Sequence, residues 1–86
     1  MKSIALITGA TSGIGKATAL ELAKLNYRLI ITGRRADRLR ELASMIENQY
    51  NTEVYPLEFD IRSRDATEKA WESLPDDLKQ VDVLIN

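Results

Sequence analysis

The chain has 86 residues, of which 44% are hydrophobic and 29% charged, with a formal net charge of −1. This length allows one domain with a modest core, and the near-zero charge offers no basic field for nucleic acid or an anionic membrane. Cysteine and histidine are both absent, which excludes disulfides, thiol catalysis, thiolate metal sites and a histidine base. Without a bilayer-length apolar run or a signal-like start, the sequence predicts a cytoplasmic protein with no membrane or nucleic-acid partner and no metal.

A strand, a glycine-rich turn and a helix follow one another at the start of the chain. An apolar run predicts a buried strand over residues 4–7. Small and apolar side chains at helical spacing predict a helix over residues 13–25, ending at Asn26, which tolerates the left-handed conformation. A turn of this kind brings backbone N–H groups and a helix N-terminus to the pyrophosphate of a dinucleotide.

If the turn binds a pyrophosphate, each of its residues has a separate role. Gly9 permits the sharp exit from the strand, Gly13 leaves room for the pyrophosphate, and Gly15 lets the helix pack closely against the sheet. Thr11 and Ser12 add hydroxyl donors. A glycine-rich turn without a ligand is the alternative. A nucleoside-triphosphate loop is excluded, because no hydroxyl residue follows the lysine after the last glycine.

The second predicted strand covers residues 28–32 and is followed by Gly33, Arg34 and Arg35. In NAD-binding folds of this type, an acidic residue at this point accepts a hydrogen bond from the ribose 2′-hydroxyl. Guanidinium groups instead bind a 2′-phosphate through paired, charge-assisted hydrogen bonds. The sequence therefore favours NADP(H), with Arg34 as the stronger candidate. The alternative is solvated arginines at the start of the next predicted helix, residues 36–50.

The second half of the chain continues the alternation of strands and helices. The remaining predicted elements are a strand over residues 53–59, a helix over residues 63–74 and a strand over residues 81–85. Pro56 cannot donate a ladder hydrogen bond, which places its strand at a sheet edge. Ser63 is a candidate helix cap. Asp76 and Asp77, after a proline, are interpreted as a solvated turn.

The strand and helix order predicts an α/β fold, the first half of a Rossmann-type doubly wound parallel sheet with strand order 3-2-1-4. The fourth strand would then be an open hydrophobic edge, which natural proteins rarely leave uncovered. We therefore expect a further segment or a partner chain to pair there. Residues 1–86 are expected to form one dinucleotide-binding segment, part of a longer single domain.

Asp60 and Ile61 follow the third predicted strand, and Asn86 follows the fourth. All three are expected at the end of the sheet where the glycine turn lies. The Asp60 carboxylate can accept a hydrogen bond from the adenine amino group, with Ile61 against the ring; an aspartate that only shapes the turn is an equal alternative. Asn86 can hold backbone groups of neighbouring strands, contact the adenosine ribose, or fray as a terminal residue.

Together, Thr8-Gly9-x-x-x-Gly13-x-Gly15, Gly33-Arg34-Arg35, Asp60-Ile61 and the Asp-Val-Leu-Ile-Asn of residues 82–86 resemble the N-terminal third of the short-chain dehydrogenase/reductase family. Residues 33–39, 60–64 and 73–75 look like its NADP-dependent serine/3-hydroxy acid dehydrogenases. The resemblance implies a pyrophosphate site at Gly9, Ser12, Gly13, Ile14 and Gly15, a 2′-phosphate site at Arg34 and Arg35, an adenine site at Asp60 and Ile61, and a ribose contact at Asn86.

The family interconverts an alcohol and a carbonyl by hydride transfer, using a tyrosine, a lysine four residues later and a serine. None of the three tyrosines of this chain has a lysine four positions later, so the catalytic residues cannot be carried over. The resemblance implies an NADP-dependent oxidoreductase for the intact protein, homo-oligomeric and acting on a small alcohol or carbonyl, while these residues alone are inactive. The alternative is a non-catalytic nucleotide-binding or regulatory module.

Overall fold

The computed structural model describes residues 3–10, 13–60 and 62–85. Four parallel strands form one sheet in the order β3-β2-β1-β4, which confirms the predicted topology and the edge position of Pro56. The strands are β1 Ile4–Ile7, β2 Arg28–Gly33, β3 Val54–Glu58 and β4 Val83–Ile85. The helices are α1 Gly13–Lys24, α2 Ala36–Tyr50 and α3 Arg64–Ser73, followed by the short 3₁₀ helix η1 Asp76–Lys79.

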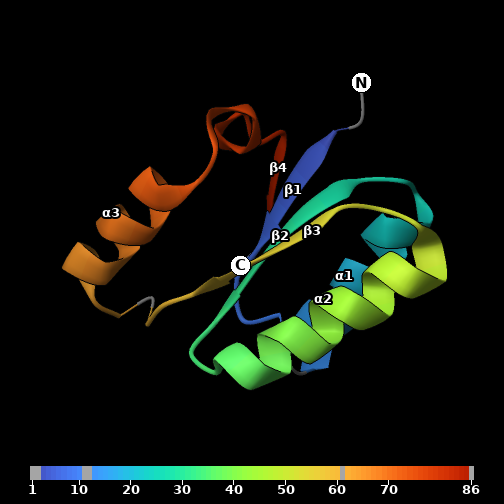
Figure 1. The fold of residues 1–86 in the computed structure, drawn as a ribbon, viewed down its shortest axis with the longest axis horizontal. Coiled ribbons are helices and arrows are strands. Elements are labelled where there is room, and N and C mark those ends of the chain that lie inside the picture. The colour runs from blue at the N-terminus through green and yellow to red at the C-terminus, as the bar shows by residue number, and fades with distance from the viewer. Residues whose placement is uncertain (1–2, 11–12, 61, 86) are drawn as a thin grey trace.

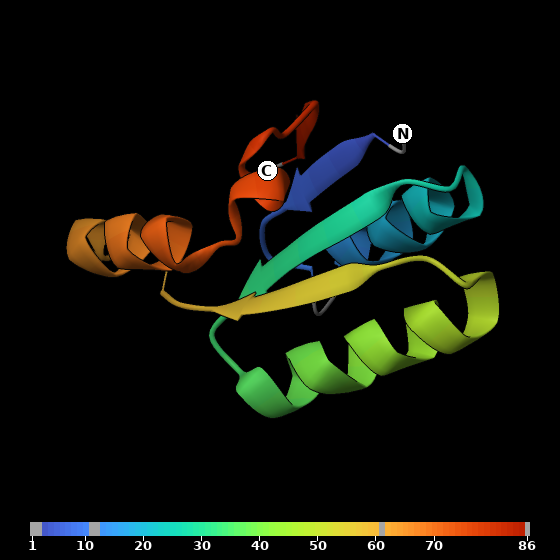
Figure 2. The same cartoon turned by 45° about the horizontal axis from the view of Figure 1, so that its top comes forward.

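Helices cover both faces of the sheet. α1 and α2 lie together on one face, and α3 with η1 lies on the other (Figures 1 and 2). Successive residues of a strand point to opposite faces, so each central strand supplies both cores. In β2, Leu29 and Ile31 join the cluster under α1 and α2, whereas Ile30 joins the cluster under α3 and η1. This double burial explains why the strands read as continuous apolar runs.

The helix ends follow the local chemistry of a few polar residues. Asn26, after α1, has a φ of 70°, which confirms the expected left-handed residue. Asn51 closes α2 in the same conformation, with a φ of 54°, and its N–H donates to the Glu47 carbonyl. The Ser63 hydroxyl accepts from the N–H of Ala66 at 3.2 Å, which confirms it as the cap of α3.

The fourth strand is shorter than predicted. β4 begins at Val83, not at residue 81, because Asp82 is held by its side chain: the N–H of Ile4 donates to Asp82 Oδ2 at 2.9 Å. The backbone N–H of Asp82 donates in turn to the Ile4 carbonyl at 2.9 Å. Asp82 therefore ties the entry of β4 to the start of β1.

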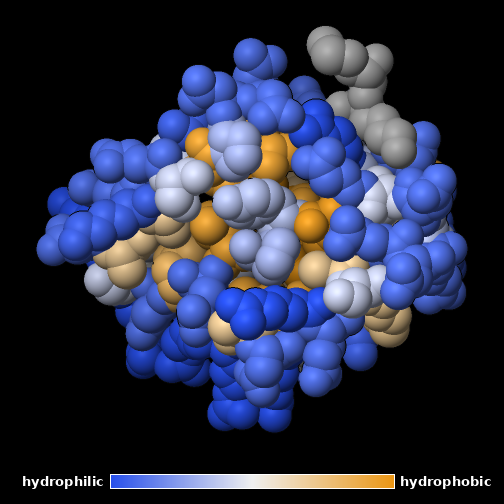
Figure 3. Space-filling view, viewed as in Figure 1, coloured by the Kyte–Doolittle hydropathy of each residue, from blue (hydrophilic) through white to orange (hydrophobic). Residues whose placement is uncertain are grey.

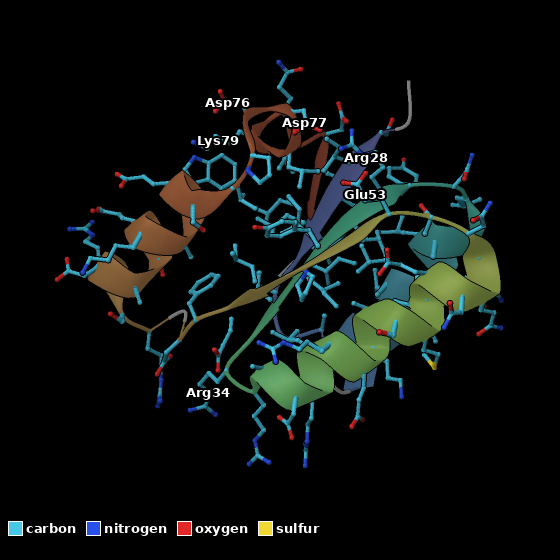
Figure 4. The ribbon with its side chains drawn as sticks, in the orientation of Figure 1. Arg28, Arg34, Glu53, Asp76, Asp77 and Lys79 are labelled. Carbon is cyan, nitrogen blue, oxygen red and sulfur yellow. The ribbon has the colours of Figure 1, made fainter. Side chains whose placement is uncertain are left out.

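An ion cluster at the amino end of the sheet includes Asp77, which is exposed as the sequence predicted but also has a partner that the sequence did not predict. Arg28, at the start of β2, bonds Asp77 of η1 at 2.8 Å and Glu53, just before β3, at 3.2 Å (Figure 4). The hydrogen bond that Arg28 donates to Asp77, followed by the one that it donates to Glu53, raises the pKa of Arg28 above its ordinary value. The side chain of Asp76, by contrast, is fully exposed, and its Oδ1 makes a longer contact of 3.8 Å with Lys79 Nζ. The cluster joins β2, β3 and η1.

The face under α3 is only partly covered. Trp71 and Leu84 are 40% and 59% exposed, and together with side chains of β1 and β3 they line an apolar cavity of about 190 Å³. Hydrophobic residues reach the surface in the centre of Figure 3, between the polar outer sides of the helices. In the described ranges, no helix has the length and apolar character needed to cross a bilayer.

We expect Ile30→Ala to lower the free energy of unfolding by about 2–5 kcal/mol, because it removes a fully buried side chain from the middle of the sheet and leaves a cavity. Urea denaturation measures the loss. The control is Leu25→Ala, at a position that is 69% exposed, where a change within about 0.5 kcal/mol is expected. Equal losses for the two variants would contradict the assigned core.

Candidate dinucleotide-binding site

Parallel pairing brings the loops that follow β1, β2 and β3 to one edge of the sheet. Backbone hydrogen bonds hold these loops together. The N–H of Thr8 donates to the Ile85 carbonyl at 2.9 Å, and the N–H of Ala10 donates to the Thr32 carbonyl at 3.1 Å. The N–H of Phe59 donates to the Gly33 carbonyl at 3.0 Å. The glycine turn, the paired arginines and Asp60 therefore follow strands whose ends are in register.

The described glycines of the turn before α1 have conformations and contacts that favour glycine. Gly9 and Gly13 have φ values of +63° and +57°, a conformation that side-chain-bearing residues rarely adopt. A Cβ on Gly15 would run into the carbonyl oxygen of Gly9 and would lie 3.2 Å from the Cα of Ala10. Gly15 therefore permits close packing of α1 against the turn itself, where the sequence predicted close packing against the sheet.

Among the described residues, nothing lies close to the side-chain position of Gly13. A Cβ on Gly13 would meet no protein atom within 4 Å in the described structure, and Ile14 beside it is 85% exposed. The first turn of α1 carries no acidic side chain, so its N–H groups and helix dipole favour an external anion. These features fit a pyrophosphate. Thr11 and Ser12, the expected hydroxyl donors, lie outside the described residues.

The two candidate 2′-phosphate residues stand between β2 and α2. Arg34 and Arg35 are both exposed, and Arg35 is the N-cap residue of α2 in an extended conformation. Arg34 extends outward beside the turn that leaves β2 (Figure 4). Its charge lies close enough to the loop after β3 to help lower the pKa of Asp60. Arg34 and Asp60 are thus close enough for their charges to interact.

Asp60 is held by a residue that sequence reasoning did not single out. Arg62 donates to it from its backbone N–H at 3.0 Å and from Nε at 3.1 Å, both to Oδ1, and from Nη2 to Oδ2 at 2.9 Å. These bonds, the side-chain ones first, lower the pKa of Asp60 to about 2. The Asp-x-Arg spacing is the signal that could have identified the pair. Ile61 and Asn86 lie outside the described residues.

A parallel sheet with a glycine turn opening its first helix is the arrangement typical of dinucleotide-binding α/β folds. The family model described as short chain dehydrogenase matches residues 3–86. The chain belongs to the short-chain dehydrogenase family.

Several relatives match nearly the whole chain. The chain is 45% identical to the serine 3-dehydrogenase of Agrobacterium fabrum, and the match covers 100% of this chain and 33% of the relative. It is 44% identical to an NADP-dependent 3-hydroxy acid dehydrogenase of Schizosaccharomyces pombe, covering 94% of this chain and 32% of the relative. The chain thus spans about a third of the length of the curated relatives that it matches.

Solved structures share the fold. An L-sorbose reductase from Gluconobacter frateurii, complexed with NADPH and L-sorbose, superposes with a TM-score of 0.91 at 29% identity, covering 99% of this chain and 32% of that chain. The serine dehydrogenase of Escherichia coli superposes with a TM-score of 0.84 at 34% identity, covering 94% of this chain and 35% of that chain.

We expect Gly15→Ala to lower the free energy of unfolding by about 1–3 kcal/mol, because the new methyl group meets backbone atoms that cannot move aside without opening the turn. Urea denaturation of the variant measures this loss. Ala17→Ser, at an exposed position of the same helix, is the control, with a change within about 0.5 kcal/mol. A Gly15→Ala variant as stable as this control would show that the turn is looser than described.

We expect the Asp60 carboxyl to titrate at about 2 instead of its ordinary 3.8. Since its pKa is lowered in the folded state, its contribution to stability is present above the unfolded value and disappears as the pH falls through about 2. The stability difference between the protein and Asp60→Asn should therefore be constant above about pH 5 and vanish in strong acid. NMR titration of the carboxyl carbon checks the value directly, and a midpoint near 3.8 would contradict it.

Proposed function

We propose that this chain forms the adenosine-binding N-terminal part of an NADP(H)-dependent oxidoreductase that interconverts an alcohol and a carbonyl. The observation that carries the proposal is the position of Arg34 and Arg35 directly after β2, beside an open glycine turn, where NAD-binding folds carry an acidic residue. Relatives named as NADP-dependent and a neighbouring structure complexed with NADPH support the same cofactor.

Each part of the cofactor has its own group of residues in this proposal. The assignments are the pyrophosphate to Gly9, Thr11, Ser12, Gly13, Ile14 and Gly15, the 2′-phosphate to Arg34 and Arg35, the adenine to Asp60 and Ile61, and the adenosine ribose to Asn86. The chemistry supports this division, because N–H groups and guanidinium groups suit phosphate, whereas a carboxylate can accept from the adenine amino group.

Bound NADP(H) supplies the hydride acceptor or donor. The residues of this chain bind and orient its adenosine half, and among its 86 residues no tyrosine is followed four positions later by a lysine. We therefore place the acid/base groups, the nicotinamide site and the substrate pocket in further residues of a longer single domain, and propose that residues 1–86 alone have no turnover.

Serine 3-dehydrogenases and 3-hydroxy acid dehydrogenases among the relatives support a small 3-hydroxy acid as the substrate class. A cytoplasmic location and a homo-oligomeric state of the whole enzyme belong to the same proposal. Cell fractionation and light scattering on the purified enzyme test these two points.

We expect the full-length enzyme to bind NADPH at least tenfold more tightly than NADH, and Arg34→Gln to remove most of this preference by weakening NADPH binding about 10–100-fold. The reason is that the variant loses a charge-assisted hydrogen bond to the 2′-phosphate, a group that NADH lacks. Fluorescence titration of both cofactors gives the dissociation constants.

Arg40→Gln, which removes an exposed arginine further along α2, is the matched control and should leave the preference intact. Equal affinity of the unsubstituted enzyme for NADPH and NADH would defeat the cofactor assignment. An enzyme that binds neither cofactor would defeat the proposed function as a whole.

A further inference from the structure

Three hydrogen bonds from one residue fix the carboxylate that follows β3. Arg62 bonds both oxygens of Asp60, through Nε to Oδ1 at 3.1 Å and through Nη2 to Oδ2 at 2.9 Å, and its backbone N–H adds a bond to Oδ1 at 3.0 Å. Only one residue separates the two partners, so the chain closes a small ring around the carboxylate. A planar guanidinium in this fork geometry fixes the plane of the carboxylate as well as its charge.

Stability alone does not account for this arrangement. The Arg62 side chain is 74% exposed and that of Asp60 is 37% exposed, and ion pairs so open to water contribute little to folding. The pair joins neither a helix to the sheet nor one strand to another, because both residues lie in the loop between β3 and α3. What the bonds do is hold one carboxylate in one orientation at the carboxyl edge of the sheet.

The two carboxylate oxygens of Asp60 accept different numbers of hydrogen bonds from Arg62. An ionised carboxylate offers about four lone-pair sites, two on each oxygen. Arg62 occupies two on Oδ1 and one on Oδ2. The remaining acceptor site therefore lies on Oδ2, and an incoming donor has one atom to meet instead of two.

We propose that Arg62 is a positioning residue for cofactor recognition: it orients the Asp60 carboxylate so that Oδ2 accepts the hydrogen bond from the exocyclic amino group of the adenine of NADP(H). This inference rests on the proposed function, since it needs the adenine to lie at Asp60.

The test compares NADPH with its deaminated analogue, in which hypoxanthine replaces adenine and a carbonyl oxygen replaces the amino group. Dissociation constants are measured by calorimetry on the full-length enzyme and its variants. The unsubstituted enzyme should bind NADPH about tenfold more tightly than the analogue. Arg62→Ala should bring this ratio close to one by weakening NADPH, with little change for the analogue, whereas a purely structural role would weaken both cofactors alike.

Two further variants separate position from charge. Arg62→Lys keeps the charge but cannot bond both oxygens as a planar fork, so it should also lose most of the ratio. Arg64→Ala removes a neighbouring exposed arginine at the start of α3 and should keep the full ratio. Thermal melting of each variant verifies that it is folded at the titration temperature.

An Arg62→Ala variant that keeps the full ratio overturns the inference. A ratio that rises in this variant also overturns it, because Arg62 would then mask the carboxylate instead of presenting it. A ratio near one in the unsubstituted enzyme overturns it as well, while leaving NADPH binding and the proposed function standing. An enzyme that binds neither NADPH nor the analogue fails the proposed function itself, so the two failures are distinguishable.

Discussion

Parallel strand pairing is the constraint on which the whole site depends. It forces the carboxyl ends of the strands to one edge of the sheet, so residues more than 50 positions apart in the sequence can serve a single ligand. The backbone bonds from Ala10 to Thr32 and from Phe59 to Gly33 align three successive loops along this edge. No side chain that would contact the cofactor is needed for this alignment, so the loops can carry residues chosen for binding.

Charged side chains are paired at the amino end of the sheet and exposed at its carboxyl end. At the amino end, Arg28 pairs with Glu53 and Asp77, and Asp82 bonds Ile4, so charged side chains join the elements to one another. At the carboxyl end, the glycine turn opens to solvent and the arginines after β2 are exposed. A chain with a net charge of −1 therefore presents local cationic charge where phosphate would bind, without a basic surface overall.

Local patterns predicted most of the fold because the central strands are buried on both faces and several helix ends carry a residue suited to them. The apolar runs, Asn26, Pro56 and Ser63 were sufficient for the order of elements and several of their ends. The contacts that were missed include one between polar side chains that are far apart in the sequence. The hydrogen bond that Arg28 donates to Asp77 joins residues 49 positions apart, and no local pattern predicts it. The candidate site could be predicted as a set of loops, but not the contacts within them.

The structure separates the recognition of phosphate from the recognition of the base. Arg34 follows β2 and Asp60 follows β3, so the two groups belong to different loops, which the bond from the Phe59 N–H to the Gly33 carbonyl holds side by side. Their charges nevertheless interact, since Arg34 helps to lower the pKa of Asp60. The bonds from Arg62 are the main causes of this lowering, and the charge of Arg34 is the smallest. The local Asp-x-Arg pair therefore holds the Asp60 carboxylate through contacts that do not involve the arginines after β2.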